Sequence, residues 1–143
     1  MFNPTSIQVR QFFIEAWQNY RAAKPLDGAS KIAAEVITRH PEYHKLLEEP
    51  QTALHADFSP DQGQINPFLH LSLHLAVEEH LAIDQPAGIR AHYLVLLRKL
   101  GNEHDAQHDV LECLGETLWK SQRAGEPPDG QAYLDCLARK SAD

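Results

Sequence analysis

The stretch NPFLHLSLHLAVEEHLAI, residues 66–83, decides the fold of this chain. Wound into a helix, it presents apolar side chains on almost its whole circumference, and a helix of that kind is buried inside a protein. Asn66 is placed to cap its first turn, and Pro67 suits the first helical position. We therefore expect a central helix from Pro67 to about Asp84, which ends before a Gln-Pro pair.

Helical spacing of apolar residues recurs along the rest of the chain, and no segment shows sustained strand alternation. We expect Asn3 to cap the first helix and Asn102 to cap the sixth, with Gly101 as a left-handed stop of the fifth and the sixth ending before Gly125. The expected helices cover about residues 4–23, 32–40, 43–49, 67–84, 89–100 and 103–124, with a last one around 133–137. The prediction is an all-α protein, a compact bundle of six or seven helices in a single domain, 1–143.

Composition and charge exclude several classes of partner. The net charge is -7, and no segment gathers Lys and Arg into the stripe that binds phosphate backbones, so we expect no nucleic acid. The longest mostly apolar run is too short to span a bilayer, and the first residues lack a secretory signal, so we expect no membrane and a cytoplasmic protein. Cys113 and Cys136 are the two cysteines, which fits reduced thiols and excludes a cysteine-based metal cage.

Two matched polar stripes interrupt this apolar pattern. His70, His74 and Glu78 are spaced by four residues, so they form one stripe along the central helix. An imidazole or carboxylate buried without a partner costs roughly 1 to 3 kcal/mol, so the stripe must face other polar groups. The same spacing recurs thirty-four residues later, in the stripe made of His104, His108 and Glu112. If the intervening helix runs antiparallel to both, the two stripes meet at one end of the bundle.

The residue types in these stripes point to a metal site. Two histidines one turn apart form a chelating pair, and a carboxylate one turn further completes the coordination sphere or acts as a base. The set His70, His74, Glu78, His104, His108 and Glu112 suits Zn, Fe or Mn and is too rich in nitrogen for Mg or Ca. A metal-binding helical protein follows, with metal-dependent hydrolysis or di-metal redox chemistry as its activity if it is an enzyme. The substrate would be a small molecule that the sequence does not identify.

A second hypothesis explains the same stripes without a metal. Histidine and glutamate can hydrogen-bond each other across a helix pair, and Arg90 on the intervening helix could neutralise Glu78 or Glu112. The protein would then be a non-catalytic interaction or structural module, with a homodimer as one form of it. Of the other histidines, His40, His44 and His55 fall around short helices and loops, where surface positions are expected.

Three segments carry a resemblance to a known family: MFNPTSIQVRQFFIEAW, NPFLHLSLHLAVEEHLAIDQPAGIRAHY and HDAQHDVLECLGETLW. Together they resemble short bacterial proteins of the domain of unknown function 1841, over nearly the whole chain. The resemblance implies a bacterial, cytoplasmic protein and implies no particular activity. More distantly, histidine and glutamate on facing helices are similar to DinB-like hydrolases and to hemerythrin and ferritin-like di-iron bundles. That likeness is architectural, because ferritin-like sites use Glu-x-x-His spacing.

Overall fold

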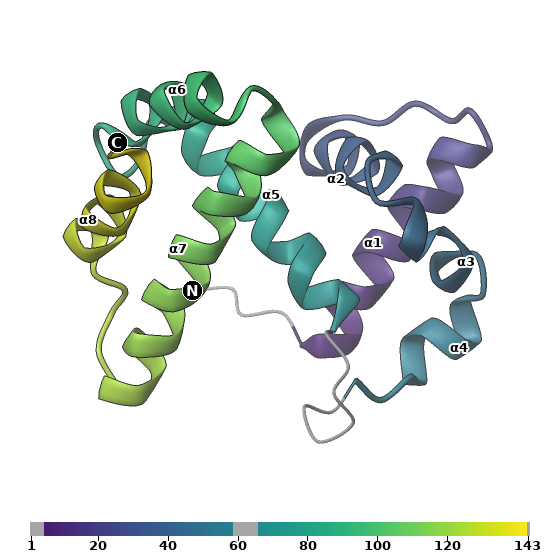
Figure 1. Ribbon diagram of the computed structural model, residues 1–143. Coiled ribbons are helices and arrows are strands. Elements are labelled where there is room, and N and C mark those ends of the chain that lie inside the picture. Colours follow the sequence, from purple (N-terminus) through teal and green to yellow (C-terminus); the bar gives the residue numbers. More distant parts are fainter. Residues whose placement is uncertain (1–4, 59–65, 143) are drawn as a thin grey trace. The chain divides into compact units, whose positions relative to one another are not determined.

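The computed structural model describes residues 5–58 and 66–142. Over these residues the chain forms eight α-helices and one short 3-10 helix, and no strand (Figure 1). The all-α class is therefore confirmed, with one more helix than the seven expected. Contacts divide the chain into two compact units, residues 1–75 and 76–143, so the single domain stays a prediction. No described helix combines the length and apolar composition needed to cross a bilayer.

The first unit, residues 1–75, is built around α1. Its elements are α1 (Ser6–Arg21), α2 (Gly28–Thr38), η1 (Pro41–Tyr43), α3 (His44–Leu47), α4 (Pro50–His55) and the first half of α5 (Pro67–Ile83). α1 packs against α2, α3 and α4. The fully or nearly fully buried side chains of this core include Phe13, Trp17, Val36, Ile37, Leu47, Phe68 and Leu71.

The first helix begins later than the sequence analysis predicted. Thr5, and not Asn3, is its N-cap, and Asn3 lies outside the described residues. The Thr5 hydroxyl accepts a hydrogen bond from the Gln8 backbone N–H at 3.1 Å, and the Gln8 side chain accepts one from the Thr5 N–H at 2.8 Å. This capping box satisfies two backbone donors at once, which explains why the helix starts after Thr5.

α4 is the helix that the sequence analysis missed, and Arg10 of α1 holds its end. The Arg10 guanidinium donates to the carbonyl oxygens of Ala53, Leu54 and Ala56, at 2.9, 3.3 and 2.8 Å. The last carbonyls of a helix have no partner inside the helix, so a cation that binds them stabilises its end. A six-residue helix is too short to form by itself, and this long-range cap explains its presence.

The second unit, residues 76–143, contains the rest of α5 with α6 (Ile89–Leu100), α7 (Glu103–Ala124) and α8 (Gly130–Ser141). α6, α7 and α8 all pack against one another. The predicted cap of α7 is confirmed, because the Asn102 side chain accepts a hydrogen bond from the Asp105 N–H at 2.8 Å. The predicted left-handed stop at Gly101 is confirmed by its φ of 82°. α7 ends before Gly125 as predicted, and that glycine has a φ of 66°.

The two cysteines form a disulfide, so the prediction of reduced thiols is wrong. Cys113 of α7 and Cys136 of α8 are joined with their Cα atoms 5.7 Å apart. Both side chains are buried where these helices pack together. Tertiary packing creates this proximity, and two cysteines 23 residues apart give no signal of it in the sequence.

Candidate metal centre

Three histidines of the first unit come together in its interior, and we call His40, His70 and His74 the histidine cluster. One ring nitrogen of each lies within 4.8 Å of a ring nitrogen of each of the others. His40 is 3% exposed and His74 is 2% exposed, while His70 is half-buried. Buried imidazoles in contact with one another are the arrangement that a metal ion can use.

His40 is the member that the sequence analysis did not include. It was predicted to lie at the surface, and that prediction is wrong because the ring is packed beside those of His70 and His74, with centroids 5.1 and 4.5 Å away. Its Nδ1 lies 2.8 Å from the carbonyl oxygen of Val36, near the end of α2. A carbonyl only accepts, so Nδ1 carries a proton, and in the neutral form of the ring the lone pair belongs to Nε2. This is how metal-binding histidines are usually oriented.

The sequence analysis predicted a stripe of His70 and His74 on α5, and the structure places their rings together. Asn66 caps α5 as expected by accepting from the Phe68 N–H at 2.9 Å. The Nε2 atoms of His70 and His74 are 3.1 Å apart. Two nitrogens bound to one tetrahedral zinc at about 2.05 Å lie roughly 3.3 Å apart. The observed separation fits two imidazoles that bind the same ion, and it also fits one imidazole donating to the other.

Tyr43 of η1 is the aromatic neighbour of the cluster. The centroid of its ring lies 5.8 Å from that of His40 and 6.0 Å from that of His70. Burial raises the pKa of Tyr43, and the Glu42 carboxylate raises it further. The phenol therefore stays uncharged near neutral pH.

His44 and His55, which the sequence analysis also placed at the surface, differ in how exposed they are. His44 is half-buried, with Nε2 2.7 Å from the carbonyl oxygen of Ile37 and its ring stacked on Trp17 at 4.3 Å between centroids. His55, at the end of α4, is exposed as predicted. Neither histidine belongs to the cluster.

Four further residues of the predicted metal set lie in the second unit. Glu78 accepts a hydrogen bond from the Gln107 side chain at 2.7 Å. His108 has its Nδ1 2.8 Å from the carbonyl oxygen of His104, one turn earlier on α7. Glu112 is exposed and accepts from the Lys140 ammonium at 2.7 Å. Their participation in one site with His70 and His74 stays a prediction.

The structure assigns Arg90 a different task from the one considered in the second hypothesis. Its guanidinium donates to the carbonyl oxygens of Leu81 and Ala82 at 3.1 and 2.9 Å, near the end of α5. Lys140 is the cation that pairs with Glu112. Arg90 therefore acts as a cap on the end of α5.

Comparisons with known proteins identify a family and no individual relative. No curated protein matches the sequence, and no solved structure matches the fold. The family model described as domain of unknown function 1841 matches residues 5–139, which is almost the whole chain. The chain belongs to the family of the domain of unknown function 1841.

Proposed function

We propose that this protein binds a divalent metal ion through His40, His70 and His74. The observation that carries the proposal is the convergence of three imidazole nitrogens within 4.8 Å in the buried interior of one unit. Two details support it: the Nε2 atoms of His70 and His74 are 3.1 Å apart, and Nδ1 of His40 lies 2.8 Å from the carbonyl oxygen of Val36, an orientation that metal-binding histidines commonly have.

The donor set favours zinc among the metals expected from the sequence. Three neutral imidazoles with no carboxylate or thiolate suit zinc, and a site with three protein ligands keeps a position for water or substrate. A bound ion of this kind supplies Lewis-acid chemistry, so metal-assisted hydrolysis of a small molecule is the activity we propose. A di-iron or di-manganese redox centre of the ferritin-like type uses several carboxylates, and the histidine cluster contains none.

The alternative is a non-catalytic module in which the histidines only specify packing, with a homodimer as one form. The distance of 3.1 Å between the Nε2 atoms of His70 and His74 also suits a hydrogen bond. Such a buried network stabilises one arrangement of the helices without any ion. The two functions differ in one measurable property, which is stoichiometric metal.

Elemental analysis of protein purified without chelators tests the proposal first. Zinc binding is then measured by calorimetry for the parent and for His40→Ala and His74→Ala, with His55→Ala as the matched control on an exposed histidine. We expect near-stoichiometric metal in the parent and at least about a tenfold loss of zinc affinity in both cluster variants, since removing even an outer partner of a ligand costs that much. The control should bind as the parent does.

Two results would decide against the metal function. One is protein that carries no metal and binds added zinc no better than His40→Ala and His74→Ala. The other is equal zinc affinity in the parent and both variants, which would place the ion elsewhere. The variant His108→Ala separately tests whether α7 supplies a ligand, as the sequence predicts. Sedimentation of the metal-free protein then shows whether the alternative takes the form of a homodimer.

A further inference from the structure

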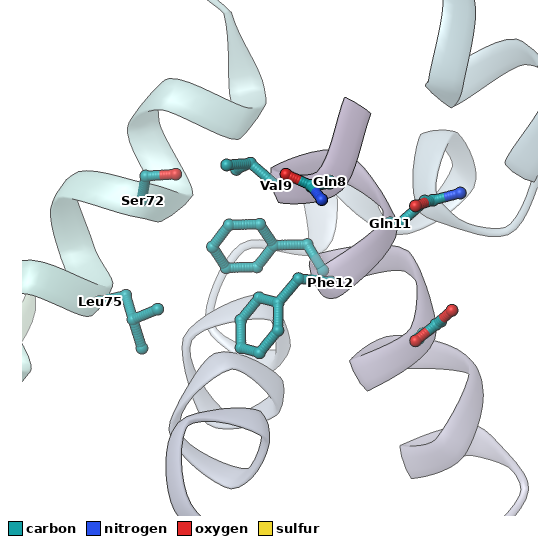
Figure 2. A pocket seen from close by; sticks show the side chains of 8 residues that line it. Gln8, Val9, Gln11, Phe12, Ser72 and Leu75 are labelled. Carbon is teal, nitrogen blue, oxygen red and sulfur yellow. The ribbon is translucent and has the colours of Figure 1, made fainter. Parts of the chain in front are cut away.

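A groove lies between α1 and α5 in the first unit, and the histidine cluster does not line it. Val9, Phe12 and Phe13 come from α1, and Ser72 and Leu75 come from α5. Figure 2 shows Phe12 and Leu75 directed toward each other from these two helices, with Val9 and Ser72 alongside. The cavity has a volume of about 520 Å³, which lies within the range of small-molecule sites and far above the voids of a close-packed interior.

A smaller hollow extends this groove along the same two helices. It has a volume of about 180 Å³ and shares Val9 and Ser72 with the larger cavity. From there it continues toward Asn66 and Leu69 at the start of α5, where Leu69 is 57% exposed. The combined space is elongated and mostly apolar, which suits a chain-like or flat hydrophobic body.

The polar side chains that line the groove indicate which kind of ligand it can bind. The Gln8 side chain is used by the capping box with Thr5, and the Ser72 hydroxyl donates to the carbonyl oxygen of Phe68 at 2.7 Å. Among the described residues of the lining, Glu15 is the one ionisable side chain. It is exposed, and it forms no ion pair with any residue that the structure describes. The described part of the groove thus combines apolar walls with one negative charge, that of Glu15.

We propose that this groove binds a small amphiphilic amine, with its hydrocarbon part between Phe12 and Leu75 and its ammonium group beside Glu15. Burial of the hydrocarbon part supplies most of the affinity. The carboxylate contributes charge selectivity, because it attracts a cation and repels an anion of the same size. The attraction is modest at an exposed position, so we expect a preference of about two- to fivefold for the amine over a neutral analogue.

The test compares three probes of equal chain length: octylamine, octanol and octanoate. Calorimetry of the full-length protein measures each affinity at pH 7, and amide NMR shifts locate the binding. We expect octylamine to bind best and octanoate worst, with the largest shifts at Val9, Phe12, Ser72 and Leu75. The variant Glu15→Gln should remove the difference between octylamine and octanol, while Glu35→Gln, an exposed glutamate on α2, should keep it.

The variant Leu75→Trp fills the groove and should abolish binding of all three probes, and circular dichroism shows whether it folds. Octanol serves as a second check, because Glu15→Gln removes no apolar surface and should leave its affinity unchanged. Equal binding of the three probes to the parent would overturn the charge assignment. Shifts confined to other residues, or an affinity for octylamine too weak to measure, would overturn the site itself.

Discussion

The disulfide between Cys113 and Cys136 permits a quantitative prediction about stability. It closes a loop of 23 residues that includes the end of α7 and the start of α8. The chain-entropy relation for a loop of that length gives about 3.4 kcal/mol of stabilisation at 25 °C, because the cross-link restricts the unfolded chain. Reduction removes the cross-link but keeps both sulfur atoms in the core, so the loss measured on reduction is close to this entropic part.

Urea unfolding monitored by circular dichroism, with and without reductant, measures the difference. We expect the free energy of unfolding to fall by about 3 kcal/mol on reduction, and the urea dependence to steepen because the reduced unfolded chain is less compact. The double variant Cys113→Ala/Cys136→Ala is the control, since reductant should not change its stability. If a thiol assay finds two free thiols in the unreduced, unfolded protein, the disulfide is refuted. If reduction lowers the free energy of unfolding by less than about 1 kcal/mol, the entropic reasoning is refuted.

Two further predictions concern single side chains. Arg10→Ala should lower the free energy of unfolding by about 2 kcal/mol, because three charge-assisted hydrogen bonds to α4 are lost at a half-buried position. The matched control Arg21→Ala removes only an exposed pair with Glu48 at 3.6 Å, and urea unfolding should show a loss below about 1 kcal/mol. If Arg10→Ala and Arg21→Ala lower the free energy of unfolding by the same amount, the cap on α4 is not what Arg10 contributes. The second prediction concerns His80, whose pKa is lowered by burial. The unfolded chain therefore binds this proton at a higher pH than the folded protein does, and the free energy of unfolding should decline below about pH 6.5. NMR titration of the His80 ring should give a midpoint below that of an exposed histidine, and a midpoint at or above it would contradict the sign.

The helices that the sequence predicted correctly are those whose ends are set by local chemistry. α7 begins at a capping asparagine and ends at a glycine with positive φ, and both signals are readable in the chain itself. α4 has no such signals beyond Pro50, and its six residues are too few for an apolar period. Arg10, 43 residues before Ala53, supplies what holds it, so only tertiary structure reveals this helix.

The candidate metal site was half predictable for the same reason. His70 and His74 repeat at one helical turn within an apolar helix, and that spacing identified them. His40 follows α2 directly before Pro41, a position typical of surface loops. One local signal was present, because a histidine four residues after Val36 at a helix end can bind the last carbonyls. That bond turns the ring inward, and the packing that brings it to α5 is not encoded in local spacing.

α5 explains why one segment supports two separate proposals. Positions 70 and 74 differ by about 40° around the helix axis, and positions 72 and 75 differ by about 60°. The two pairs lie on roughly opposite sides of the helix. One side carries His70 and His74 to His40, and the other carries Ser72 and Leu75 to the groove with α1. An apolar pattern all round the helix is what two buried sides require, since each must pack against neighbours while admitting its own polar groups. Zinc affinity should therefore respond to His74→Ala and not to Glu15→Gln, and octylamine affinity should respond in the reverse way.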